Sequence, residues 1–391
     1  MTDMTDVTMD RGSGGRLEVV IAGAGVAGLE AAFALRELTG DGVGVTLLAP
    51  TDEFIYRPMA VGEPFTSGWA RHYPLARLAA EAGAELRHDA LVGVDAEHGI
   101  VRTAGGSELR YDALLVCLGA SAHARYEHVT TVDDAHMDEL LHGLVQDVEE
   151  GYVKHLGFVI PAPTPWPLPA YELALMCSER AWAMQAQLAV TLLTPEESPL
   201  AVFGREASLA VSKLLAERHI DVVTSAYCEV PKAKTVTIHP GATTLTVDRL
   251  VALPELRGPQ VRGLPHDREG FVPIDEYGRV RGVDRVWAAG DATDFPVKHG
   301  GVSAQLADSI AQSVAALAGA CPGPSPFEPV LEGVLLTGGT PRYLRGRPTG
   351  GHGAESELTE VSRRTAPVKI AARYLTPHLV QPGSFQVGAP A

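Results

Sequence analysis

The stretch "VVIAGAGVAGLEAAFALREL", Val19 to Leu38, decides how the chain folds. The apolar run Leu17 to Ala22 predicts a buried strand, and apolar residues at helical spacing after it predict a helix. Between them lies Gly23-x-Gly25-x-x-Gly28. There the first glycine permits a tight turn, the second lets a pyrophosphate approach the backbone, and the third packs helix against strand. The helix N-terminus then faces the phosphates, so the pattern predicts a dinucleotide site.

A second buried strand is predicted at "VGVTLLAP", Val43 to Pro50. Strand, helix and strand in this order predict a parallel sheet. The acidic residue that commonly binds the adenosine ribose is absent, because this strand ends in Leu47-Leu48-Ala49. Asp52 or Glu53 substitutes for it from the following loop, or the contact is made by backbone alone.

An internal repeat extends this architecture. "GVTLLAPTDE" from Gly44 matches "AVTLLTPEES" from Ala189, and the lead-ins "VVIAGAG" and "GFVIPAP" correspond. We therefore predict an α/β fold with two Rossmann-like dinucleotide-binding domains and a C-terminal extension. The expected divisions are a disordered tail 1–16, a split first domain 17–125 and 245–325, a second domain 126–244, and the extension 326–391. Within the extension, "GVLLTGGTPRYLRG" predicts a hairpin, the stretch after it a flexible link, and "VKIAARYLTPHLV" a short amphipathic helix.

The second turn differs from the first. Where the first has glycines, Pro161 to Pro169 reads "PAPTPWPLP", with five prolines and no glycine. Proline has no amide hydrogen to donate, and without glycine the backbone cannot closely approach a pyrophosphate. The residues therefore predict a poor NAD(P)H site, although an unusual pose of NAD(P)H stays open.

The motif "RVWAAGDATDFP" adds a second ligand-binding feature. A strand ends at Gly290, and Asp291 is placed where a carboxylate accepts hydrogen bonds from the ribityl hydroxyls of a flavin. "HGGVSAQLADSIA" opens a helix at about Val302, whose N-terminal amides would face the flavin pyrimidine.

With these motifs the sequence resembles the FAD-dependent pyridine nucleotide-disulfide oxidoreductase superfamily. It is most similar to the branch of type II NADH dehydrogenases, sulfide:quinone oxidoreductases and flavocytochrome c sulfide dehydrogenases. The motifs that carry the resemblance span roughly residues 17 to 318; they are "VVIAGAGVAGLEAA", "EFIYRPMA", "YDALLVCLGA", "WAAGDATDF" and "KHGGVSAQLAD". The resemblance implies an oxidoreductase with non-covalent FAD and no metal, and it includes Gly119, which closes "YDALLVCLGA", in the cofactor site.

The resemblance also suggests roles for single residues. Lys298 would lie near the isoalloxazine and favour the anionic reduced flavin. His299 relays protons or is a solvated loop residue. Arg57 contacts the FAD phosphates or only caps its loop. Glu172 is a proton-handling carboxylate, or a glutamate that satisfies helix N-terminal amides.

Sulfide-oxidising relatives carry a redox cysteine in the second turn, where this chain has Trp166. The nearest cysteine is Cys177, and none follows Cys321. Sulfide chemistry needs a thiolate pair, so the residues disfavour it. Trp166 and Tyr171 instead offer an aromatic surface on which a quinone or small aromatic molecule stacks, or Trp166 simply belongs to the core. "AQLA" at Ala304 resembles the quinone-side motif of the dehydrogenases, without its later glutamine.

Composition limits the function classes. The 391 residues carry a formal net charge of -16, so a nucleic-acid partner is disfavoured. No run of about 18 apolar residues predicts a membrane span, and four distant cysteines predict neither a disulfide framework nor a zinc site. We expect a cytoplasmic protein, at most peripheral at a membrane through its basic tail, with a homodimer as an open alternative.

The resulting hypothesis is two-electron transfer at FAD with a small-molecule redox substrate. An NAD(P)H dehydrogenase with a divergent second domain, and a non-catalytic redox-sensing flavoprotein, are the alternatives.

Overall fold

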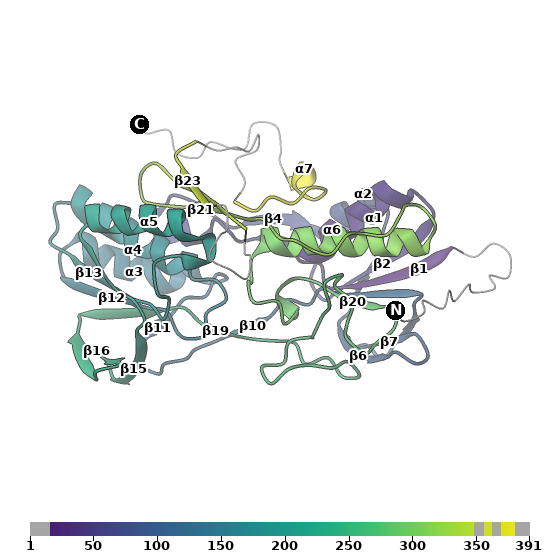
Figure 1. Cartoon of the computed structure of the whole chain (residues 1–391), viewed down its shortest axis with the longest axis horizontal. Helices are drawn as coiled ribbons and strands as arrows, with labels where there is room; N and C mark the ends of the chain where they lie inside the picture. The colour runs from purple at the N-terminus through teal and green to yellow at the C-terminus, as the bar shows by residue number, and fades with distance from the viewer. Residues whose placement is uncertain (1–15, 348–355, 362–368, 380–391) are drawn as a thin grey trace.

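The computed structural model describes residues 16–347, 356–361 and 369–379, and the expected tail 1–16 lies almost wholly outside them. Two parallel sheets form side by side along the long axis of the molecule, each with helices on one face (Figure 1). The prediction of an α/β fold with two Rossmann-like units is confirmed.

The first unit is built on a parallel sheet with the strand order β20-β9-β1-β2-β5 among the described residues. Helices α1, α2 and α6 cover one face, and the small antiparallel sheet β6-β7-β8 lies on the other (Figure 1). The bounds are β1 Leu17–Ala22, α1 Val26–Thr39, β2 Val43–Ala49, β3 Glu53–Tyr56, η1 Ala60–Phe65, β4 Arg71–Pro74, α2 Leu75–Glu81, β5 Glu85–His88, β6 Leu91–Asp95, β7 Ile100–Thr103, β8 Glu108–Arg110, β9 Ala113–Val116, β20 Val286–Ala288, η3 Gly290–Ala292 and α6 Gly300–Leu317.

The second unit repeats this plan with the order β11-β18-β12-β13-β14, and its pairings are also parallel. Helices α3, α4 and α5 cover one face, and β15-β16-β17 forms a separate antiparallel sheet (Figure 1). The bounds are β11 Thr130–Thr131, α3 Met137–Glu149, β12 His155–Val159, α4 Leu168–Ala183, β13 Ala189–Leu193, η2 Ala201–Phe203, α5 Arg205–Glu217, β14 Ile220–Val223, β15 Tyr227–Lys232, β16 Thr235–His239, β17 Thr243–Thr246 and β18 Arg249–Ala252.

The second unit extends past residue 244, where we expected it to end. Strand β18 pairs with β12, because its apolar residues complete the buried parallel sheet. The chain crosses between the units in β10 (Ser121–His123) and returns in β19 (Glu255–Arg257), and these two strands pair with each other.

The C-terminal extension corrects two expectations. The predicted hairpin is present as β21 (Leu331–Leu335) and β22 (Arg342–Gly346). Part of the expected flexible link, Ser356–Thr359, is instead strand β23, which pairs with β22. The expected amphipathic helix is wrong for residues 369–375, where the amides of Ile370, Tyr374 and Leu375 bond to side chains of other elements. Only α7, Thr376–Leu379, is helical, and Pro377 is tolerated in its first turn.

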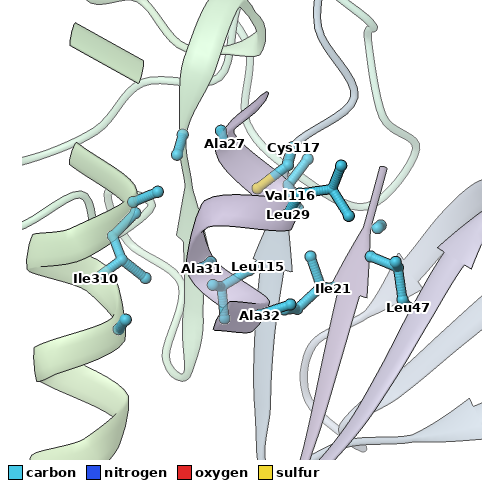
Figure 2. Close-up of a cluster of buried hydrophobic side chains, with 14 of the residues drawn as sticks. Ile21, Ala27, Leu29, Ala31, Ala32, Leu47, Leu115, Val116, Cys117 and Ile310 are labelled. Carbon is cyan, nitrogen blue, oxygen red and sulfur yellow. The ribbon is translucent and has the colours of Figure 1, made fainter. Parts of the chain in front are cut away.

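Helix α1 lies between sheet and helix in the core of the first unit. Figure 2 shows Ile21, Leu47 and Leu115 reaching it from the strands and Ile310 from α6. Ala31 and Ala32 on α1 are small and fully buried, so that the helix packs closely between the sheet and α6. The core therefore fixes the start of α1 relative to the start of α6, the two helix ends that frame the candidate site.

Candidate functional site

The first turn is held tightly by backbone contacts. Gly23 has φ of +105°, and its amide donates to the Leu48 carbonyl at 2.8 Å. A Cβ atom on Gly23 would lie 2.2 Å from the Cys117 carbonyl oxygen, and one on Gly28 would lie 1.9 Å from the Gly23 oxygen. No side chain fits at either position, so these two glycines are required by the close approach of strand, turn and helix.

Gly25 has a different environment. A Cβ atom built there meets no atom within 4 Å. Gly25 also caps α1, whose first turn has no acidic residue and no side-chain cap. The first amides of a helix have no partner within the helix, and they carry partial positive charge. The turn thus offers open space and free donors, as an anionic pyrophosphate requires.

Gly290 lies between this turn and the start of α6. Its φ is +77°, and a Cβ atom on it would lie 3.4 Å from the Ala27 Cβ and 3.6 Å from the Ser303 Oγ. Gly290 therefore sits between the first turns of α1 and α6. Val302, in the first turn of α6, is buried. Gly119, with φ of +72° and open space at its Cα, follows β9, the strand beside β20.

Asp291 follows Gly290 and is partly buried. Burial raises the pKa of its carboxyl, the Lys298 charge lowers it, and the charge of Asp134 raises it further. The Nε atom of Arg57 lies 4.0 Å from Oδ1 of Asp134. The structure thus gathers Arg57, Asp134, Asp291 and Lys298 near one another. Sequence reasoning missed Asp134; the signal was its place just after β11, at the edge of a parallel sheet.

Lys298 is buried, with 7% of its surface exposed. Its Nζ donates to the Thr293 carbonyl and lies 4.0 Å from the centroid of the Phe271 ring. Burial lowers the pKa of Lys298 to about 8, against the opposing charges of Asp291, Asp294 and Asp267. The site therefore holds an amine whose charge changes close to neutral pH.

Trp166 lies directly beside the Lys298–His299 loop. Its ring centroid is 4.5 Å from that of His299 and 5.7 Å from that of Phe203. The Lys298 amide also approaches the Pro165 carbonyl, at 3.4 Å. His299 is buried, which rules out a solvated loop histidine. Trp166 is partly buried against the second core, so it both contributes to packing and borders the site.

Glu172 is fully buried in α4. Its Oε2 lies 2.7 Å from Nζ of Lys369, and its Oε1 accepts the Leu336 amide at 2.9 Å. Burial raises the pKa of Glu172, and the Lys369 ammonium opposes that rise. Its recorded partners belong to the C-terminal extension rather than to the first turn of its own helix. No local pattern predicts this pair, because 197 positions separate the two residues.

In the corresponding part of the second unit, an acidic side chain is hydrogen-bonded by its own neighbours. Glu196 follows β13, where a dinucleotide-binding unit presents a carboxylate to a ribose. Here its Oε2 accepts the Tyr171 hydroxyl at 2.6 Å and the Thr194 hydroxyl at 3.0 Å. Burial raises the pKa of Glu196. Tyr171 is fully buried, so the expectation that its ring forms part of a stacking surface is wrong.

The two candidates for the ribose contact in the first unit are already paired. Oδ1 of Asp52 lies 3.1 Å from Nδ1 of His88, and Oε2 of Glu53 lies 2.8 Å from Nδ1 of His72. Both carboxylates are exposed.

All four cysteines are free. Cys117 and Cys177 are buried, and burial raises the pKa of each thiol to about 12. Neither is a thiolate near neutral pH, so the structure contains no redox-active disulfide and no activated cysteine at these positions. In the described residues, three or more potential metal ligands nowhere gather into a group.

The family model of pyridine nucleotide-disulphide oxidoreductases matches residues 17–148 and 170–319. The chain belongs to this family. The expectation of an oxidoreductase is thereby confirmed. The matched ranges omit residues 149–169, which contain β12 and the proline turn. The family pattern is thus interrupted where the second unit has lost its glycines.

Solved structures of three proteins share the fold. The sulfide:quinone oxidoreductase of Aquifex aeolicus aligns with a TM-score of 0.77 at 20% identity, over 88% of this chain and 87% of that one. A ferredoxin reductase for the CYP199A2 system from Rhodopseudomonas palustris aligns with a TM-score of 0.62 at 19% identity, over 85% of this chain and 83% of that one. An NAD-dependent persulfide reductase from A. fulgidus aligns with a TM-score of 0.57 at 20% identity, over 84% of this chain and 64% of that one. Their names indicate different redox partners, so the shared fold does not select one.

None of the helices in the described parts of the chain is long and apolar enough to cross a membrane.

Proposed function

We propose that the protein is a flavoprotein oxidoreductase that binds FAD non-covalently in its first unit and carries out two-electron transfer. The observation that carries this proposal is the contrast between the two turns. The turn at Gly25 has open space beside the start of α1, whereas the second turn carries prolines instead of glycines and the Glu196 carboxylate beside it is hydrogen-bonded to Tyr171. One dinucleotide therefore fits this chain.

The residues suited to hold FAD come from several elements. Gly25 would face the pyrophosphate with the first amides of α1, Gly23 and Gly28 would keep the turn tight enough for that approach, and Arg57 would add a positive charge. The backbone at Gly119 and Gly290 would lie along the flavin, with Asp291 accepting from ribityl hydroxyls and the start of α6, at Val302, facing the pyrimidine. Bound FAD supplies transfer of an electron pair, and the protein supplies position and electrostatics.

Lys298 is the proposed charge beside the flavin. A buried ammonium stabilises negative charge nearby more strongly than an exposed one, because little water screens it. Its contacts with Thr293 and the Phe271 ring hold Nζ in place without an ion pair at short distance. Lys298 thus acts by holding or releasing a proton at Nζ.

The electron partner we favour is a quinone or another small, flat, apolar molecule. Trp166 presents an aromatic ring beside His299, on the loop that leads into α6. Nicotinamide binding is disfavoured, because the proline turn donates few amides and Oε2 of Glu196 already accepts the Tyr171 and Thr194 hydroxyls. Sulfide oxidation is disfavoured by the buried, high-pKa cysteines. Glu172, held by Lys369, is a poor proton carrier unless that pair opens.

The test is anaerobic stopped-flow of the purified protein, following the visible absorption band of oxidised flavin. We expect bound FAD, slow bleaching by NADH, NADPH and sulfide, and fast bleaching by a quinol or fast reoxidation by a quinone. Fast bleaching by a nicotinamide would make the protein a dehydrogenase with a divergent second unit. Bound FAD that no donor reduces would favour the redox-sensing alternative, and a protein that takes up no FAD would refute the proposal.

A further inference from the structure

Residues 369–379, which we call the clasp, lie over helices of both units although they are far from them in sequence. In Figure 1 the clasp appears at the top, where α7 lies beside α1 and α2. Most of its apolar side chains are buried: Ile370, Ala372, Leu375 and Leu379 are between 1% and 8% exposed. The clasp is therefore packed against the protein and does not lie on its surface as a loose tail.

Its two anchors are equivalent glutamates of the internal repeat. Helix α1 begins at Val26 and α4 at Leu168, so Glu30 and Glu172 each lie four residues after the start of the helix that follows the first strand of their unit. Both side chains are 0% exposed. A carboxylate at such a position is costly to bury unless it is paired, so each requires a partner. The clasp supplies partners to both.

The first anchor is the ion pair between Lys369 and Glu172, in which Nζ and Oε2 are 2.7 Å apart. The side chains are 10% and 0% exposed. Breaking a buried pair leaves an uncompensated charge, which is much more costly than losing a surface pair. This contact joins the clasp to the second unit.

The second anchor is the carboxylate of Glu30, which accepts the amides of Tyr374 at 2.9 Å and Leu375 at 2.5 Å. Asp308, on α6, faces it from the neighbouring helix, and the charge of Arg373 on the clasp lies close to this acid pair. Hydrogen bonds to a charged acceptor are roughly twice as strong as neutral ones. This contact joins the clasp to the first unit.

Between the anchors the clasp covers the start of α6. The Ile370 amide donates to the Tyr56 hydroxyl at 2.9 Å. A Cβ atom on Gly300 would lie 2.3 Å from the Ile370 Cδ1, and one on Gly301 would lie 3.8 Å from the Ala371 carbonyl oxygen. The outer end is held by the Tyr73 hydroxyl, which donates to the Leu379 carbonyl at 2.9 Å.

We propose that the clasp ties the two dinucleotide-fold units together through Glu30 and Glu172, opens as one unit, and limits how fast FAD enters and leaves beneath it. The gating part rests on the proposed function, since it places FAD at the start of α6. The tying part does not depend on FAD. Each anchor lies on a different unit. When the contact with Glu172 is broken, the clasp is held at one end fewer, and its contact with Glu30 therefore opens more often.

The first experiment is hydrogen–deuterium exchange of the protein without added cofactor. In Glu172→Gln and in Lys369→Met, we expect the Tyr374 and Leu375 amides, at the opposite anchor, to exchange roughly tenfold faster or more. The matched control is Glu217→Gln, an exposed glutamate that pairs with Lys213 at 3.8 Å on α5. It should leave exchange in the clasp unchanged. Faster exchange confined to residues 369–371, with Tyr374 and Leu375 exchanging as in the parent, would refute the proposal that the clasp opens as one unit.

The second experiment measures the rate of FAD release from loaded protein by trapping free FAD in excess apoflavodoxin. We expect Glu172→Gln and Lys369→Met to release FAD several-fold faster than the parent and Glu217→Gln. If the Tyr374 and Leu375 amides exchange faster in these variants but FAD is released at the parent's rate, the clasp does not limit FAD release. The part of the proposal that the clasp ties the two units together would then still hold. If the parent takes up no FAD, the proposed function fails, and the exchange result still decides whether the clasp exists.

Discussion

The Nζ atom of Lys298 lies 4.0 Å from the centre of the Phe271 ring, in a buried position where its ammonium has the Thr293 carbonyl as hydrogen-bond acceptor. Burial lowers the pKa of Lys298 to about 8, despite three nearby aspartates that favour its charged form. Its charge therefore depends on pH in the range where the protein is easily studied.

We predict that Lys298→Met lowers the reduction potential of bound flavin at pH 7, because it removes a positive charge that favours the reduced anion. Above about pH 8 the parent's Lys298 is neutral, so the difference between parent and variant should shrink as pH rises through that value. Potentiometric titration from pH 6 to 9 checks this. Lys232→Met, an exposed position on β15, serves as control. A difference that is constant with pH would contradict the assigned titration.

The buried carboxyl of Asp308 should make the stability of the protein depend on pH. Burial, and the charge of Glu30, raise the pKa of Asp308 to about 8. An acid whose pKa is higher in the folded state binds more protons there than when unfolded. Its contribution is full below about pH 4 and is lost as pH rises to about 8. We therefore expect Asp308→Asn to be more stable than the parent at pH 8 and to lose that advantage at pH 5.

Denaturant midpoints measured from pH 5 to 9 check this prediction, with the exposed Asp221→Asn on β14 as control. The charges that face Asp308 are those of Glu30 and Arg373, so Glu30→Gln should flatten the same pH dependence. Equal pH profiles for parent and Asp308→Asn would show that the acid pair does not titrate in this range.

The glycines of the first turn should separate folding from binding. Gly28→Ala places a Cβ atom 1.9 Å from the Gly23 carbonyl oxygen, so we expect roughly 3 kcal/mol or more of destabilisation. Gly25→Ala meets open space, so the protein without cofactor should melt like the parent but hold less FAD. Thermal denaturation and the flavin-to-protein absorbance ratio measure the two effects. A Gly25→Ala variant with full FAD content would show that the pyrophosphate does not bind at this turn.

Trp166→Ala should raise KM for the quinone or aromatic substrate about threefold to tenfold, with little change in kcat, because a stacking surface is lost. Trp166→Phe should keep most of the affinity. Trp182→Ala, at the exposed end of α4, is the control for loss of a tryptophan. If kcat falls while KM stays constant, Trp166 supports the fold of the site rather than the substrate.

Local patterns in the sequence predicted most of the fold. The strand–glycine turn–helix order at Gly23 to Gly28 and the repeat at Ala189 indicated two parallel sheets, because apolar period and turn chemistry are short-range properties. The second boundary was wrong, since the pairing of β18 with β12 depends on strands distant in sequence. The expectation of a poor NAD(P)H site in the second unit also comes from the sequence, because five prolines remove amides wherever the turn lies in space, and it stays a prediction.

The sequence by itself determined that one turn carries the glycines of a dinucleotide-binding turn and that the other carries prolines in their place, because backbone donors and glycine conformation are properties of the local chain. Tertiary structure decided which side chains share an environment. It placed Lys298 against Phe271, Tyr171 on Glu196, and Lys369 on Glu172. These contacts set pKa values and burial, which depend on the surrounding dielectric and on charges brought together only by folding.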